Sequence, residues 1–250
     1  MVAATEVWYS QKCGQGVVRI VDPSSMALIA PCILAADFSR LAEGLEIIKA
    51  AGVTLVHVDV MDGHFVPDIT VGQPVIASLR RATGLTLDVH LLIERPERFV
   101  REFAKAGAGR LCVHPESTSQ LRRVLGLIRE CGAEAGVALN PGTTVESVSD
   151  VLGEIDFLTI LSADLGVGEQ TFIPHSISKL HTAARLKARQ SRPFALQVEG
   201  GITMENLYEL ARAGADILVV GSAIFNSQDP SARLSEIIQL ASVTRQASAV

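Results

Sequence analysis

From Leu28 onward, the sequence alternates between short apolar segments of strand length and longer segments with helical periodicity. Eight strands are expected, at Leu28–Leu34, Thr54–Val60, Thr86–Leu91, Arg110–His114, Ala135–Leu139, Phe157–Leu161, Ala195–Val198 and Ile217–Val220. The clearest helices are predicted over Phe38–Ala51, with Asp37 as its N-cap, and over Ser117–Cys131. Strands that alternate with helices in this way indicate parallel strands joined by helical crossovers.

A glycine recurs where a helical segment ends and the next strand begins. Gly52, Gly107, Gly132 and Gly214 all occupy this position, which favours the left-handed cap that reverses the chain. Eight strand–helix units with no internal linker predict one α/β domain, a (β/α)8 TIM barrel over residues 27–245. Residues 1–26 are expected to form a poorly ordered N-terminal extension. An open doubly wound sheet is the alternative, but no G-x-G-x-x-G follows the first strand.

Composition limits the function classes. The chain has 250 residues, a usual length for one such barrel, and its 22 Lys+Arg against 27 Asp+Glu give a net charge of −5. This balance argues against a nucleic-acid or membrane partner, because phosphate-rich surfaces attract basic patches. Cys13, Cys32, Cys112 and Cys131 show no disulfide or zinc-site spacing, and the N-terminus lacks the pattern of a secretory signal. We therefore expect a cytoplasmic protein.

Polar side chains at strand ends are the candidate catalytic groups, because barrel active sites lie at the carboxyl ends of the strands. His57 and Asp59 are two residues apart and point to the same face of their strand; His90 and Glu199 end two other strands. Two imidazoles and two carboxylates could bind one divalent cation, although a single buried histidine is more often a hydrogen-bonded core residue. Asp88 is expected one layer lower in the barrel or on its helix side.

Glycines follow each of the last three predicted strands. Gly166 and Gly168 follow the sixth strand, Gly200-Gly201 the seventh, and Gly221-Ser222 the eighth. Backbone amides of such loops commonly bind a phosphate in barrel enzymes, although each glycine could also serve only a tight turn. The remaining histidines of interest, His64, His175 and His181, are expected to be solvent-exposed.

Six segments together resemble ribulose-phosphate 3-epimerase. They are Ile29–Phe38 (IAPCILAADF), His57–Pro67 (HVDVMDGHFVP), Leu87–Ile93 (LDVHLLI), Ala138–Gly142 (ALNPG), Val198–Ile202 (VEGGI) and Gly221–Phe225 (GSAIF). The resemblance extends over about Leu28 to Ala241, and HVDVMDGHFVP is highly specific to this family and its close relatives. The family has a (β/α)8 barrel and inverts C3 of a 2-keto sugar phosphate with the help of a divalent metal.

The resemblance implies a role for each candidate residue. His57, Asp59, His90 and Glu199 would bind one divalent ion (Zn, Fe, Mn or Co), and the two carboxylates would exchange protons on opposite faces of the substrate. The substrate would be bound by Cys32, Met61, His90, Gly166, Gly168, Gly200, Gly201, Gly221 and Ser222. The substrate implied is a small sugar phosphate, with D-ribulose 5-phosphate the simplest choice, and the chain would be an isomerase of carbohydrate metabolism that assembles as a homo-oligomer.

Several site positions depart from the family pattern. Glu199 stands where the family has Asp, Cys32 where it has Ser, and Leu92 and Leu161 where methionines are expected. In the loop after the sixth strand, the acidic residues Asp164 and Glu169 would place negative charge near a phosphate.

These departures keep three alternatives open. The first is 3-epimerisation of another ketose phosphate such as D-allulose 6-phosphate, to which the segment Val113–Ser117 gives weak support. The second is a non-catalytic barrel that binds a sugar phosphate or a partner protein. The third is a related barrel that decarboxylates or cleaves its substrate, against which stands the absence of a strand-end lysine: Lys49, Lys105, Lys179 and Lys187 all fall in helical segments.

Overall fold

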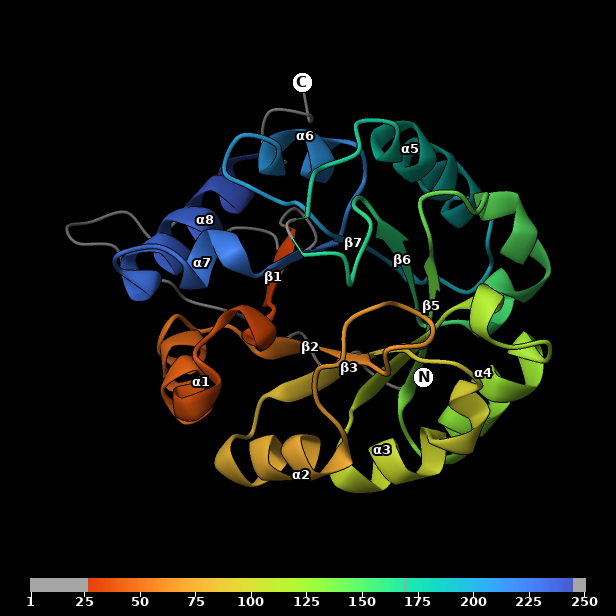
Figure 1. The fold of residues 1–250 in the computed structure, drawn as a ribbon. Helices are drawn as coiled ribbons and strands as arrows, with labels where there is room; N and C mark the ends of the chain where they lie inside the picture. Colours follow the sequence, from red (N-terminus) through yellow and green to blue (C-terminus); the bar gives the residue numbers. More distant parts are fainter. Residues whose placement is uncertain (1–26, 169, 245–250) are drawn as a thin grey trace, which may run out of the picture.

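The computed structural model describes residues 27–168 and 170–244; the expected extension at residues 1–26 and the acidic residue Glu169 lie outside the described residues. Eight parallel strands form a barrel, and helices surround it on the outside (Figure 1). The (β/α)8 barrel predicted from the sequence is therefore confirmed.

The strands run in the order β1-β8-β7-β6-β5-β4-β3-β2. Their bounds are β1 Leu28–Pro31, β2 Leu55–Met61, β3 Thr86–Leu92, β4 Arg110–Val113, β5 Glu134–Leu139, β6 Phe157–Leu161, β7 Ala195–Glu199 and β8 Ile217–Val220. A parallel bridge between Cys32 and His57 joins the two ends of this order, so the sheet closes on itself.

Helices follow nearly every strand. They are α1 Leu41–Ala50, α2 Gln73–Ala82, α3 Val100–Ala106, α4 Leu121–Glu130, α5 Ser176–Lys187, α6 Leu207–Arg212, α7 Ser222–Phe225 and α8 Pro230–Thr244. Between β5 and β6 the connection is the 3₁₀ helix η6, Val145–Glu154, and shorter 3₁₀ turns are η2 Ile33–Ala35, η3 Phe38–Arg40, η4 Pro96–Arg98 and η5 Pro115–Ser117. Among the described residues, no helix is both long and apolar enough to cross a membrane.

Several predicted element boundaries are wrong. The strand expected over Leu28–Leu34 ends at Pro31, and the 3₁₀ turn η2 follows it. The helix expected from Ser117 begins only at Leu121, because Thr118 is extended (φ −145°, ψ 142°) and its hydroxyl accepts the N–H of Gln120. The helix expected from Phe38 begins as the 3₁₀ turn η3, which Asp37 caps by accepting the N–H of Ser39 at 2.9 Å. Both errors at the helix starts come from polar side chains that bind nearby backbone groups before the helix begins.

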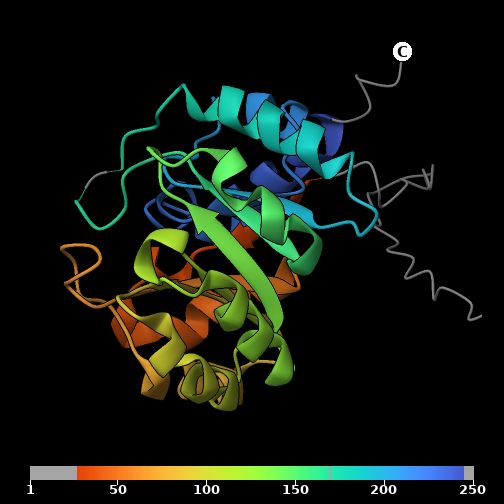
Figure 2. The ribbon, with the colours of Figure 1, turned by 90° about the vertical axis from the view of Figure 1, so that its right-hand side faces the viewer.

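The predicted glycine caps between each helical segment and the next strand are confirmed. Gly52, Gly107, Gly132 and Gly214 all have positive φ, from 76° to 111°, as the left-handed cap requires. Apolar side chains that point outward from the strands pack under the helices, and polar side chains at the carboxyl ends point into the barrel. In Figure 2 the loops that follow β2 (orange) and β6 (teal) project from the same end of the barrel.

Candidate metal centre

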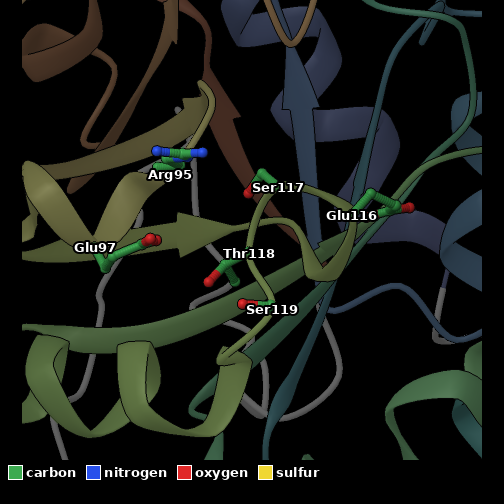
Figure 3. A pocket seen from close by; sticks show the side chains of 6 residues that line it. All are labelled: Arg95, Glu97, Glu116, Ser117, Thr118 and Ser119. Carbon is green, nitrogen blue, oxygen red and sulfur yellow. The ribbon is translucent and has the colours of Figure 1, made fainter.

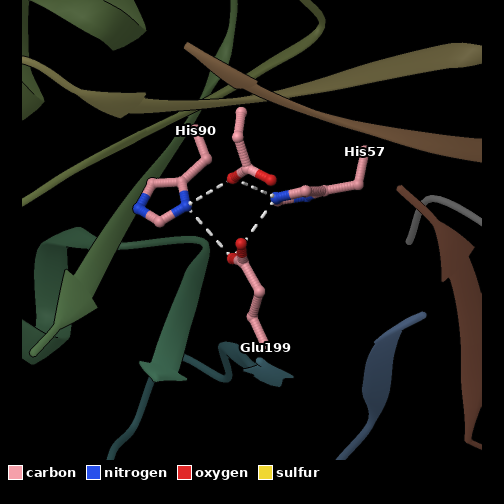
Figure 4. Close-up of side chains that lie close together, drawn as sticks. His57, His90 and Glu199 are labelled. Atoms are coloured by element: carbon pink, nitrogen blue, oxygen red, sulfur yellow. Dashed lines mark hydrogen bonds and ion pairs between the residues drawn. The ribbon is translucent and has the colours of Figure 1, made fainter. Parts of the chain in front are cut away.

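Four donor atoms meet inside the carboxyl end of the barrel. Asp59 Oδ1 lies 3.2 Å from His57 Nε2 and 3.1 Å from His90 Nδ1. Glu199 Oε2 lies 3.1 Å from the same nitrogen of His90 and 3.3 Å from that of His57. The four side chains are buried, and each nitrogen contacts both carboxylates (Figure 4). Nitrogen and oxygen donors therefore alternate around one small space.

The strand register explains this convergence. Side chains alternate along a strand, so His57 and Asp59 both point inward from β2 while Val58 between them packs outward. Asp59 is paired in register with His90 on β3, which places these two side chains next to each other. Glu199 ends β7 and reaches the same space because the sheet is closed.

The donor set fits a divalent metal ion. All four donor atoms lie within 4.8 Å of one another. Two imidazoles and two carboxylates suit Zn²⁺, Fe²⁺, Mn²⁺ or Co²⁺, whose bonds of about 2.0–2.2 Å hold neighbouring ligand atoms roughly 3 Å apart. Glu199 Oε2 is buried and accepts no hydrogen bond within the described residues, so its partners there are the two imidazole nitrogens that it contacts.

The electrostatics of the site balance two carboxylates against two imidazoles. Burial acts to lower the pKa of His57 and His90, but the neighbouring carboxylates outweigh it; the pKa of His57 is raised well above its usual range and that of His90 to about 9. Burial acts to raise the pKa of Asp59, yet the two histidines hold it well below its ordinary value. A metal ion that binds here must therefore displace protons from the imidazoles.

A buried polar network lies behind His57. Its Nδ1 atom is 2.8 Å from Asp88 Oδ2, which also accepts from Gln197 Nε2 at 3.1 Å and lies 3.5 Å from Arg110 Nη1. Asp88 is thus inside the barrel one layer below the centre, so of its two expected positions the helix-side one is wrong. Burial acts to raise the pKa of Asp88, but Arg110 and His57 lower it to about 2.

A second imidazole lies behind His90. His90 Nε2 is 2.8 Å from His114 Nε2, and the two rings are stacked with centroids 4.9 Å apart. Burial lowers the pKa of His114 to about 4, so this ring is neutral. Sequence reasoning missed His114 as a functional residue; its position at the end of β4 was the available signal, because strand ends in a barrel face the site.

Cys32 contacts the centre from the β1 side. Its thiol donates to Asp59 Oδ2 at 3.2 Å, the carboxylate oxygen that is not shared between the two histidines. Burial, and then the charge of Asp59, raise the pKa of Cys32 well above its usual value, so the sulfur stays a protonated donor. A Cβ atom on Gly221 would approach Cys32 Cβ to 3.3 Å, which places Gly221 directly beside this contact.

An apolar cluster lies at the same end of the barrel, formed by Met61, Val66, Leu92, Leu161 and Leu165. Met61, Leu92 and Leu161 are the last residues of β2, β3 and β6. Strands β2 and β3 also carry the two histidines of the centre. Leu92 and Leu161, which stand where the family pattern has methionines, therefore pack together with the predicted substrate contact Met61.

The glycines expected at a phosphate occupy distinct places. Gly200 (φ 104°) and Gly201 (φ 63°) follow β7, and a Cβ on either would come within 3 Å of the backbone of Ala163 or Phe172. Gly166 (φ 72°) lies instead against Val66 of the loop after β2. Gly168 has positive φ and open space around it, and Ser222 is the exposed first residue of α7.

The histidines predicted to be solvent-exposed are exposed. His64, His175 and His181 are exposed, as is Asp164, whose charge is thereby solvated. Lys49 lies in α1, Lys105 in α3, and Lys179 and Lys187 in α5, so none of these four lysines ends a strand.

Comparison with known proteins agrees with this geometry. A sequence model of the ribulose-phosphate 3 epimerase family matches residues 28–225. The chain is 38% identical to the ribulose-phosphate 3-epimerase of Aquifex aeolicus over 215 residues, 86% of this chain and 97% of that protein. It is 41% identical to the Escherichia coli ribulose-phosphate 3-epimerase (88% and 98% covered) and 40% identical to the chloroplastic ribulose-5-phosphate-3-epimerase of Arabidopsis thaliana (90% and 83% covered).

Solved structures with a similar fold are more distant in sequence. Orotidine 5'-phosphate decarboxylase from Pyrococcus horikoshii superposes with a TM-score of 0.63 at 16% identity, over 86% of this chain and 99% of that one. Thiamine phosphate pyrophosphorylase from Pyrococcus furiosus gives 0.61 at 14% identity, over 89% and 98%. At these identities the likeness concerns the barrel fold alone.

Proposed function

This chain belongs to the ribulose-phosphate 3 epimerase family, and we propose that it is a metal-dependent isomerase that converts D-ribulose 5-phosphate to D-xylulose 5-phosphate by inverting C3. The observation that carries this proposal is the buried set of alternating nitrogen and oxygen donors, His57, Asp59, His90 and Glu199, at the carboxyl end of the barrel.

His57, Asp59, His90 and Glu199 would hold the ion. When bound, it would act as a Lewis acid that stabilises the negative charge of the enediolate formed when C3 loses its proton. The chain itself must move that proton. Asp59 and Glu199 approach from β2 and β7, and each has a second carboxylate oxygen besides the one that contacts both histidines.

Inversion requires one carboxyl group on each face of the substrate. One removes the C3 proton, the other returns a proton to the opposite face, and the roles exchange with the direction of reaction. The Cys32 thiol holds Asp59 by its second oxygen and so limits rotation of that carboxylate. Glu199 is longer than the family's Asp by one methylene group, which shifts its carboxylate by about an ångström, a displacement that matters for proton transfer.

The remaining proposed roles concern the substrate. Met61 would pack against the enediolate together with Leu92 and Leu161. Gly200 and Gly201, with Gly221-Ser222 and the Gly166–Gly168 loop, would bind the phosphate through backbone N–H groups. Support for the first two glycines is their positive φ beside packed backbone, where no side chain fits.

Another ketose phosphate is the alternative substrate, because residues that depart from the family pattern lie at the centre. Cys32 touches Asp59, and Leu92 and Leu161 lie in the apolar cluster at the site. These changes would suit a different ketose phosphate such as D-allulose 6-phosphate.

The test is exchange of the C3 hydrogen in deuterated water. The protein with added divalent metal would be incubated separately with D-ribulose 5-phosphate and D-allulose 6-phosphate. We expect rapid exchange with the first and its loss in Asp59→Asn, which keeps the size of the side chain but cannot accept the proton. Faster exchange with the second would reassign the substrate. A protein that binds metal but exchanges neither substrate would contradict the epimerase function.

We also propose a cytoplasmic homo-oligomer whose barrel domain spans residues 27–245 behind an extension at residues 1–26. The family assignment supports a sugar phosphate as the partner, and the net charge of −5 argues against nucleic acid. Sedimentation of the full chain and of a chain that begins at Ala27 would test the oligomer and the domain boundary together.

A further inference from the structure

The two histidines of the centre turn different ring nitrogens toward its carboxylates. His57 presents Nε2 and His90 presents Nδ1. A neutral imidazole binds a metal through its unprotonated nitrogen, so His57 must carry its proton on Nδ1 and His90 on Nε2. For His57, the buried carboxylate of Asp88 accepts that proton's hydrogen bond at 2.8 Å.

For His90 the acceptor is His114, a second imidazole, which can also donate. The two Nε2 atoms are 2.8 Å apart, so one must donate and the other must accept. Because His90 donates when its Nδ1 is free for the metal, His114 must accept with Nε2 and carry its own proton on Nδ1. Both rings are fully buried, so bulk water is not an alternative partner.

Glu116 faces the nitrogen that must carry this proton. Its Oε2 atom lies 3.4 Å from His114 Nδ1, a buried atom that makes no hydrogen bond among the described residues, and a quarter of the Glu116 side chain is exposed. Its other oxygen, Oε1, accepts from the backbone N–H of Asn140 at 3.2 Å and from the hydroxyl of Thr143. Two donors therefore fix Oε1, and Oε2 is left as the oxygen available to His114.

We propose that Glu116 is a positioning residue for the metal centre: through His114 it fixes the proton of His90 on Nε2 and keeps Nδ1 free to bind the ion. This inference rests on the metal-dependent function proposed above. Glu116 lines an open pocket together with Glu97 (Figure 3), so the arrangement extends from a solvent-facing wall to the buried donor atoms.

Glu116→Gln is the sharpest variant. Asn140 and Thr143 both donate to Oε1, so the amide oxygen of the new side chain would take that position and its NH₂ group would face His114 Nδ1. The NH₂ group would then favour His114 with its proton on Nε2, where it opposes the N–H of His90. The substitution thus moves the preferred proton of His114 from Nδ1 to Nε2 while it preserves the shape of the side chain at position 116.

The experiment measures Zn²⁺ affinity by competition with a chelator and reads the protonated ring nitrogen of His114 by ¹⁵N NMR of the full chain labelled in histidine. We expect the proton on Nδ1 in the unsubstituted protein, and a loss of Zn²⁺ affinity of about 10–100-fold in Glu116→Gln. Glu97→Gln is the matched control, since it removes the same charge from the same pocket and should leave affinity unchanged.

Substitution of His114 itself separates positioning from packing. His114→Gln keeps an acceptor oxygen near the position of Nε2, whereas His114→Leu removes it. If the acceptor behind His90 Nε2 fixes the proton of that ring, His114→Gln retains more of the Zn²⁺ affinity than His114→Leu. Melting temperatures show whether both variants fold.

Two results would overturn the inference: a His114 proton on Nε2 in the unsubstituted protein, or unchanged Zn²⁺ affinity in Glu116→Gln. Either result, in a protein that binds Zn²⁺ tightly and exchanges the C3 hydrogen, leaves the proposed function intact. An unsubstituted protein that binds no divalent metal would instead overturn the proposed function, and the positioning role with it.

Discussion

The two metal-site histidines have different hydrogen-bond partners behind them, and we call these the His57 side and the His90 side of the centre. Behind His57 lies Asp88, a fully buried carboxylate, whereas behind His90 lies His114, a neutral ring that depends on Glu116 for its proton position. The first side is fixed by charge and the second by the placement of a proton. Buried charges are costly to leave unpaired, so the His57 side should dominate stability, while the His90 side should affect mainly the metal.

The largest effect is expected from Asp88→Asn. This change removes the negative charge beside Arg110, which is itself buried and stacked 3.8 Å from the centre of the Phe157 ring. The buried Arg110 would keep only the largely exposed Glu134 as a charged partner, so the free energy of unfolding should fall by about 3–5 kcal/mol in urea titrations of the metal-free protein.

A double variant sharpens this reading. Asp88→Asn combined with Arg110→Met removes both charges and should recover a large part of the lost stability, whereas His114→Gln should cost less than Asp88→Asn. Equal losses from Asp88→Asn and His114→Gln would show that the two sides do not differ as described.

The pH dependence of stability separates the two sides next. Burial lowers the pKa of His114 from 6.5 to about 4, so between these values the unfolded chain binds a proton that the folded chain does not, and stability falls as pH falls. The pKa of His90 is raised to about 9, so stability of the metal-free protein is instead lost as pH rises from 6.5 to 9.

His114→Gln should therefore remove the loss on the acid side, on the order of 2 kcal/mol between pH 6.5 and 4.5, and leave the loss on the alkaline side. Urea midpoints of the metal-free protein at a series of pH values would measure both. An acid side as steep as that of the unsubstituted chain would mean that His114 is not the buried neutral group.

This contrast also shows what the sequence alone could predict. Strand periodicity places His57 and Asp59 on one inward face, and the glycines after the helices give the barrel, because both signals are local. The role of His114 depends on a 2.8 Å contact between β3 and β4, which no spacing along the chain encodes. The start of α4 was misplaced because Thr118 competes for the backbone of the expected first turn.

A smaller effect is expected at Asp59, where the two sides meet. Cys32→Ser, which restores the family's residue, replaces a thiol 3.2 Å from Asp59 Oδ2 with a stronger hydroxyl donor. The bond should tighten by up to about 1 kcal/mol, which corresponds to a change of a few-fold in the exchange rate. Measured rates with both ketose phosphates would show whether this position also selects the substrate. A change in rate greater than tenfold would mean that the residue contacts the reacting atoms.

The smallest effect should come from Glu134→Gln, and it tests the comparison most directly. Each side ends at a carboxylate: Glu116 behind His114, and Glu134 at 3.1 Å from Arg110 behind Asp88. Arginine stays protonated and has no alternative tautomer, so loss of the largely exposed Glu134 cannot alter which nitrogen of His57 carries the proton. Zn²⁺ affinity should stay within about twofold in Glu134→Gln, against the 10–100-fold loss in Glu116→Gln. Similar losses in both variants would indicate that nearby negative charge affects metal binding in general, and not that Glu116 fixes the proton of His90 through His114.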